Sequence, residues 1–115
     1  MNLGINDGAN GFSNAQTTTN LQAIIDAARL SGDVLLATPH PINPANVPDA
    51  NQSARNAAIV SLAAAQGVPC IDLRAYFGSY AAISSRMPDG VHPSAEMAAE
   101  IGSVYRQCIQ AMATA

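Results

Sequence analysis

Val34-Leu35-Leu36-Ala37-Thr38 is the stretch of sequence that decides the expected fold. It is an apolar run without polar alternation, which is typical of a parallel strand buried on both faces. Residues 68–73 form a second such run, and an alanine-rich helix is expected between the two, over about residues 52–66. Gly67 is expected to end that helix. A strand, a helix and a strand in this order predict a βαβ unit with a parallel sheet.

The flanking segments continue the alternation of strands and helices. A helix is expected from about Asn20 to Leu30, with Gly32 as its left-handed cap. The proline-rich segment 39–49 is expected to be a loop. Residues 74–93 are expected to be irregular apart from a short helix over about 75–82. A last helix is expected from about Ser94 to Met112, with one apolar stripe: Met97, Ile101, Val104, Tyr105, Cys108, Ile109 and Met112.

These elements predict one α/β domain. With a strand stub at residues 2–5, it would hold about three parallel strands and three to four helices.

Composition excludes several classes of function. The 115 residues include five arginines and no lysine, and the net charge is −3. Without a basic patch we expect no nucleic-acid partner, and no apolar run is long enough for a membrane span. Cys70 and Cys108 lack the spacing of metal ligands, so no metal site is predicted. They are interpreted as two buried small side chains, and a disulfide between them stays open.

Two short motifs carry residues suited to chemistry. Gly4-Ile5-Asn6-Asp7-Gly8 stands where a strand is expected to give way to a loop, and Asp89-Gly90-Val91-His92-Pro93 precedes the last helix. A carboxylate three residues before a histidine can accept its Nδ1 proton and leave Nε2 free as a general base. The amide of Asn6 could donate to a developing oxyanion. General base, orienting carboxylate and oxyanion donor are parts of an acyl-transfer site.

Together the motifs resemble a known family. Gly4-Ile5-Asn6-Asp7 is similar to the GxND block of the SGNH or GDSL hydrolases, and Asp89-Gly90-Val91-His92-Pro93 is similar to their DxxH block. Residues 35–39 and 67–73 also resemble family strands. The resemblance implies a flavodoxin-like three-layer α/β/α sandwich. It further implies that Asn6 donates to the oxyanion, His92 acts as general base and Asp89 orients it.

One part of the family pattern has no counterpart. The nucleophilic serine of a Gly-Asp-Ser block and the glycine of the oxyanion hole do not appear in the sequence. We therefore expect residues 1–115 to be the C-terminal portion of a single hydrolase domain, inactive alone. An apolar strand edge would then be exposed, which predicts poor solubility, self-association or pairing with the missing N-terminal half. Ser13 resembles a nucleophile elbow only faintly, and Ser94 is better explained as a helix cap.

The expected activity is cleavage of a carboxylic ester or an acetylated carbohydrate through an acyl-enzyme, without a cofactor. The alternatives are a non-catalytic binding or assembly module with this fold and an inactive fragment. The sequence indicates neither the compartment nor the acyl and alcohol specificity.

Several other residues allow two interpretations. Gly4, Asp7 and His40 are weak candidates for substrate contacts. For His40 a solvated loop position is the favoured interpretation, and for Asp7 a role in shaping its turn. Packing is the expected role of three aromatic residues, and a surface position that of Arg86, rather than a pocket wall and an anion clamp. The aromatic residues are Tyr76, Phe77 and Tyr80.

Overall fold

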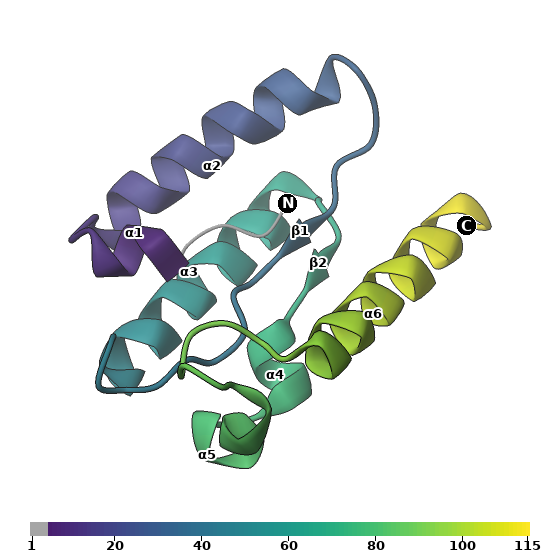
Figure 1. Ribbon diagram of the computed structural model, residues 1–115. Coiled ribbons are helices and arrows are strands. Elements are labelled where there is room, and N and C mark those ends of the chain that lie inside the picture. The colour runs from purple at the N-terminus through teal and green to yellow at the C-terminus, as the bar shows by residue number, and fades with distance from the viewer. Residues whose placement is uncertain (1–4) are drawn as a thin grey trace.

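The computed structural model describes residues 5–115, in which helices surround a short parallel sheet (Figure 1). The longer helices are α2 (Asn14–Arg29), α3 (Asp49–Gln66) and α6 (Ala95–Ala113). The shorter ones are α1 (Ile5–Ala9), α4 (Leu73–Phe77), α5 (Tyr80–Ile83) and the 3-10 turn η1 (Ser84–Arg86). The strands are β1 (Leu36–Ala37) and β2 (Cys70–Ile71). The expected α/β character is confirmed at this level.

The two strands pair in parallel, with Leu36 beside Cys70 and Ala37 beside Ile71. Both are much shorter than the apolar runs that predicted them. Pro69 has no N–H to donate to the ladder, and Asp72 already caps α4, where its carboxylate accepts the N–H of Ala75 at 2.9 Å. The described residues hold two of the three expected strands, and most of the stub expected at residues 2–5 lies outside them.

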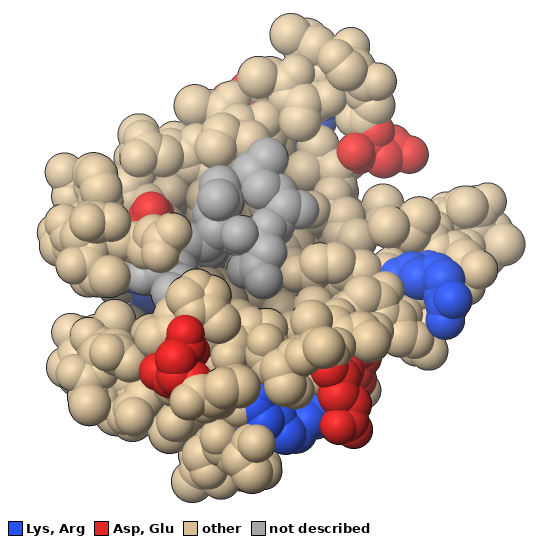
Figure 2. Space-filling model, in the orientation of Figure 1, with Lys and Arg blue, Asp and Glu red and all other residues tan. Residues whose placement is uncertain are grey.

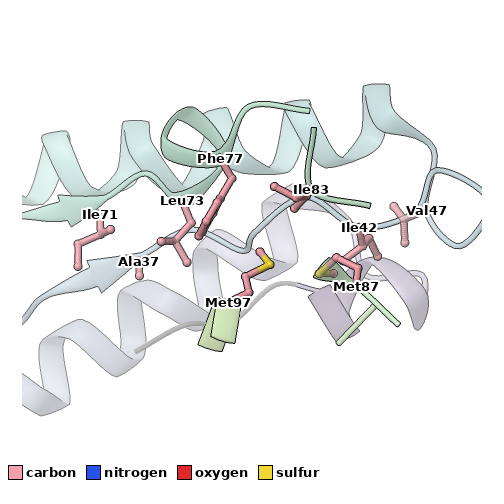
Figure 3. Packing of buried hydrophobic residues seen from close by; sticks show 9 residues of the cluster. All are labelled: Ala37, Ile42, Val47, Ile71, Leu73, Phe77, Ile83, Met87 and Met97. Atoms are coloured by element: carbon pink, nitrogen blue, oxygen red, sulfur yellow. The ribbon is translucent and has the colours of Figure 1, made fainter. Parts of the chain in front are cut away.

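Successive residues of β1 join different apolar clusters. Leu36 belongs to a cluster with Ile25 of α2 and Ala63 of α3. Ala37 belongs to a second cluster that includes Met97 of α6 (Figure 3). Side chains alternate along a strand. Helices α2 and α3 therefore pack on one side of β1, and α6 packs on the other.

Helix α2 begins earlier than expected. Ser13 is its N-cap: the Oγ of Ser13 accepts the N–H of Gln16 at 3.1 Å, and the Oε1 of Gln16 accepts the N–H of Ser13 at 2.8 Å. This capping box stabilises a helix start at Asn14. The prediction of a start near Asn20 was wrong. Gly32 is not a left-handed cap, since α2 ends at Arg29 and its C-cap, Leu30, has a right-handed conformation.

The other helix ends follow the sequence more closely. Gly67 ends α3 with a positive φ of 60°, and Ser94 caps α6 by accepting the N–H of Met97 at 3.2 Å. Met97 is fully buried, but the predicted stripe of α6 fades along the helix, where Ile109 is 57% exposed. Residues 75–82 divide between α4 and α5 because Gly78, with a φ of 79°, separates them.

Both cysteines are free, and both are half-buried rather than fully buried as expected. Burial, followed by the charge of Asp72, raises the pKa of the Cys70 thiol, which suits a packing role rather than reactivity. Among residues 5–115, no helix combines the length and the apolar character that a membrane crossing needs.

Candidate active site

The loop of residues 89–92 holds a carboxylate and an imidazole in contact. The Oδ2 of Asp89 accepts the Nδ1–H of His92 at 2.6 Å. The Oδ1 of the same carboxylate accepts the backbone N–H groups of Val91 at 2.9 Å and His92 at 2.6 Å. Because an ionised carboxylate only accepts, His92 carries its proton on Nδ1 and leaves Nε2 as a lone pair. The expected orientation of His92 by Asp89 is therefore present in the geometry.

These hydrogen bonds favour the charged form of Asp89. They hold the pKa of its carboxyl well below the usual range, first through the backbone N–H of His92, then through the imidazole and the N–H of Val91. A carboxylate that stays ionised can stabilise an imidazolium formed beside it. The pair is thus suited to take up and release a proton.

The pair lies open at the surface. The His92 side chain is 80% exposed and that of Asp89 is 56% exposed. The imidazole of His92 is therefore accessible, and no hydroxyl among residues 5–115 is hydrogen-bonded to it.

His40 is buried against the loop of residues 89–92. The expectation that it is a solvated loop residue was therefore wrong. It is 8% exposed, and its Nε2–H donates to the carbonyl oxygen of Val91 at 3.0 Å. The adjoining Pro41 is also buried, and prolines limit the conformations of the segment. The N–H of Asn43 donates to the carbonyl of Gly90 at 2.8 Å. Segment 38–43 is thus attached to the loop by two hydrogen bonds.

The first motif lies differently from its expected position. Ile5–Ala9 is helical, so Asn6 lies on α1 rather than between a strand and a loop. Asn6 is exposed, and no hydrogen bond or ion pair among the described residues joins it to Asp89 or His92. Gly4 lies outside the described residues.

Asp7 lies within helix α1 rather than in the turn that it was expected to shape, but it makes structural contacts with two other helices. Its Oδ2 accepts the hydroxyl of Thr17 at 2.9 Å, and Arg55 lies 4.0 Å from the same oxygen. Arg55 also donates to the Oγ1 of Thr17 at 2.8 Å. These contacts tie α1, α2 and α3 together rather than presenting Asp7 to a substrate.

The aromatic and arginine residues of the irregular segment mainly pack. Phe77 belongs to the apolar core, while the hydroxyl of Tyr76 donates to Glu100 of α6 at 3.0 Å. Arg86 pairs with the same Glu100, as expected of a surface residue. On the face drawn in Figure 2, charged side chains are few and scattered.

A pocket of about 340 Å³ lies beside His40, and we call it the α3 pocket. It is bounded by residues 8–14, by segment 39–47, by residues 51–56 of α3 and by Arg74. Its polar wall includes His40, Asn51, Gln52, Arg55, Asn56 and Arg74.

Apart from His40, the polar residues of the α3 pocket were not predicted from the sequence. Gln52 and Asn56 continue toward the N-terminus the helical spacing of Ile59 and Ala63, which are buried. Polar side chains at core-facing positions were the signal that could have found them. Gln52 holds the pocket rim by accepting the N–H of Ile42 at 3.0 Å and donating to the carbonyls of Ile42 at 2.9 Å and Val47 at 2.6 Å.

Over residues 5–115, no three His, Cys, Asp or Glu side chains gather in an arrangement that could hold a metal ion.

The comparison with protein families adds an independent finding. The sequence model of the GDSL-like Lipase/Acylhydrolase family matches residues 1–99. The chain belongs to the GDSL-like lipase/acylhydrolase family. No curated protein and no solved structure matches it. The matched range includes both the GxND-like motif and the Asp89–His92 pair, so the resemblance to SGNH/GDSL hydrolases is confirmed. Membership of the family supports ester hydrolase chemistry.

Proposed function

We propose that this chain supplies the general base, its orienting carboxylate and an oxyanion donor to a serine ester hydrolase. The observation that carries the proposal is the 2.6 Å hydrogen bond from the His92 imidazole to Asp89, in a chain of the GDSL-like family. It leaves the Nε2 of an exposed imidazole free to accept a proton.

In this mechanism His92 Nε2 takes the proton of a serine hydroxyl as the serine oxygen bonds to the ester carbonyl carbon. The Asp89 carboxylate stabilises the imidazolium. The imidazolium then gives its proton to the departing alcohol, which leaves an acyl-enzyme. Water repeats the sequence and releases the acid. Asn6 would donate its amide N–H to the oxyanion, which requires α1 to bring it to the reacting carbonyl.

The nucleophile of this mechanism comes from outside these 115 residues. The sequence contains no Gly-Asp-Ser block, and no described hydroxyl is hydrogen-bonded to His92. A segment carrying that block, and the oxyanion glycine, would complete the site.

The same segment would complete the fold. We infer that the whole domain is a flavodoxin-like three-layer sandwich, of which this chain is the C-terminal portion. The parallel pairing of β1 with β2 supports this. So does the packing of Leu36 and Ala37 in different apolar clusters. The added strands would extend this short sheet, and a sheet edge that lacked them would favour self-association.

The exposed His92 without a hydroxyl partner also suits a second candidate, a non-catalytic binding or assembly module. That function would keep the fold and ligand contacts without turnover. Activity measurements separate the two candidates.

The test is hydrolysis of 4-nitrophenyl acetate by this chain, alone and with an added N-terminal segment of the family that contains the Gly-Asp-Ser block. We expect activity only in the combined sample. Asp89→Asn should lower kcat by about 10³–10⁴-fold, because the imidazole loses its orienting carboxylate. Asp33→Asn, at an exposed carboxylate, is the matched control and should change little.

Two results would count against the proposal. One is a combined sample that is folded and associated but inactive, which favours the non-catalytic module. The other is activity that His92→Ala leaves unchanged.

A further inference from the structure

Three residues of the α3 pocket wall each carry a buried polar atom without a hydrogen-bond partner: His40 Nδ1, Asn56 Oδ1 and Arg74 Nη1. All three residues line the pocket. Buried polar atoms of native proteins are nearly always hydrogen-bonded. Three exceptions around one cavity therefore point to a ligand that supplies the missing partners.

Each of the three side chains is already held by its other polar atom. His40 Nε2–H donates to Val91. Asn56 Nδ2 donates to the carboxylate of Asp72 at 3.2 Å, and Arg74 Nη2 donates to Asp49 at 2.6 Å. These bonds orient the unpaired atoms, so the hydrogen-bonding character of each is known.

The set consists of two acceptors and one donor. His40 donates through Nε2, and in the tautomer with its proton on Nε2 the Nδ1 atom accepts. Asn56 directs its NH₂ group at a carboxylate, so Oδ1 is fixed as an acceptor. Arg74 Nη1 can only donate.

The chemical class of the ligand follows from this set. A carboxylate would satisfy Arg74 but bring no proton for His40 and Asn56. An apolar ligand would satisfy none of the three. A hydroxyl group both donates and accepts, so a molecule with several hydroxyls matches all of them.

We propose that the α3 pocket binds a polyhydroxylated molecule of the size of one sugar ring. Its volume of about 340 Å³ suits a small ligand. Phe12, Ile42 and Val47 in the wall offer apolar surface to the C–H groups of such a ring. The three unpaired atoms are closed off from solvent, so binding includes a side-chain rotation in the wall, a common change on complex formation.

The pocket adjoins the loop of residues 89–92, because His40 contacts both. This step rests on the proposed function: the hydroxylated molecule would then be the alcohol portion of the ester, as in an acetylated carbohydrate. A ligand hydroxyl on Nδ1 would also hold His40 in the tautomer that donates to Val91.

The test is a titration of the ¹⁵N-labelled chain with methyl β-D-glucopyranoside, followed by NMR, with sodium acetate as the anionic probe. We expect the glycoside to shift the imidazole signals of His40 and the side-chain amide signals of Asn56. Arg74→Lys keeps a positive charge that can face Asp49. It lacks the second NH₂ group of the guanidinium, the unpaired Nη1 that would donate to the ligand. It should weaken the glycoside about tenfold or more. Arg106→Lys, at an exposed position on α6, is the matched control and should bind like the wild type.

A shift caused by acetate and not by the glycoside would overturn the proposal in favour of an anion site. Absence of glycoside binding to a chain whose melting curve shows it folded would also overturn it. Binding needs no turnover, so a chain that binds the glycoside but hydrolyses no ester would refute the proposed function alone. Ester hydrolysis without glycoside binding would refute this inference alone.

Discussion

In the loop of residues 89–92, the hydrogen bonds that form the carboxylate–imidazole pair join residues two or three positions apart. The α3 pocket instead gathers side chains from residue 8 to residue 74, and the tertiary fold alone brings them together. Two long-range bonds, from His40 and Asn43, then attach the loop to the rest of the molecule. The difference teaches that a short sequence spacing is enough to form the carboxylate–imidazole pair, whereas the pocket depends on the packing of distant segments.

The largest expected effect is on stability and comes from a substitution in the apolar core. Ile25 is fully buried between α2 and its neighbours, and Ile25→Ala should lower the free energy of unfolding by about 2–5 kcal/mol. Ile109→Ala, at a 57% exposed position, should change it by less than about 0.5 kcal/mol. Urea denaturation measures both.

The same pair of variants sharpens the comparison by NMR. At low temperature, where Ile25→Ala is still folded, signals of the pocket residues should move, while the Nδ1–H signal of His92 keeps its wild-type position. Loss of the His92 signal in the folded variant would show that the loop depends on the core as much as the pocket does.

A smaller effect is expected from the rim of the pocket. Gln52→Glu keeps an acceptor for the N–H of Ile42 but removes both donors and sets a carboxylate against two carbonyl oxygens. The free energy of unfolding should fall by about 1–3 kcal/mol. Gln107→Glu, exposed on α6, is the control for added charge. Equal melting temperatures for the two variants would contradict the assigned role of Gln52.

Substitution of two glycines tests how closely the loop of residues 89–92 packs against segment 38–43. Gly90 and Gly67 have φ angles of 77° and 60°, and alanine at either costs about 1–2 kcal/mol in the left-handed region. A Cβ at Gly90 would also lie 3.0 Å from the Cβ of Asn43, whereas one at Gly67 meets nothing within 4 Å. Gly90→Ala should therefore be the more destabilising in thermal melts. A lower melting temperature for Gly67→Ala than for Gly90→Ala would indicate that segment 38–43 moves to accommodate the added Cβ at little cost.

The smallest effect concerns the charge of Asp89. Because its pKa is lowered on folding, the stability that it contributes is present above the ordinary value of 3.8 and is lost as the pH falls below it. In His92→Ala the pKa of Asp89 should rise but stay below 3.8, since the backbone N–H groups of residues 91 and 92 still donate. A ¹³C NMR titration of the carboxyl group measures this. A return to 3.8 would show that the imidazole alone is responsible.

Much of the element order followed from the sequence, and the errors have physical causes. The capping box at Ser13 and Gln16 was present in the sequence, but the run of polar and threonine residues after it hid the start of α2. The strands were predicted too long because apolar runs indicate burial, whereas pairing also needs a neighbour with free N–H groups. Pro69 has no N–H to donate at one end of β2, and beyond the other end the N–H of Leu73 donates to the Oγ1 of Thr38 instead of to a strand carbonyl.

His40 shows the same limit for the candidate site. Nothing in Thr38-Pro39-His40-Pro41 distinguishes a solvated loop from a buried one, since the partner of His40 lies 51 positions away. Asp72 is a similar case: it caps α4, accepts from Asn56 and lies near the buried Thr38.

The sequence by itself determined the family and the Asp89–His92 pair, because both depend on residue types at fixed short spacings. It also determined the N-cap of α6 and the left-handed end of α3, which are local hydrogen-bond and backbone effects. The tertiary structure alone decided the burial of His40, the assembly of the α3 pocket and the exposure of His92. Those features depend on which distant segments share one core, and no local spacing in the chain encodes that.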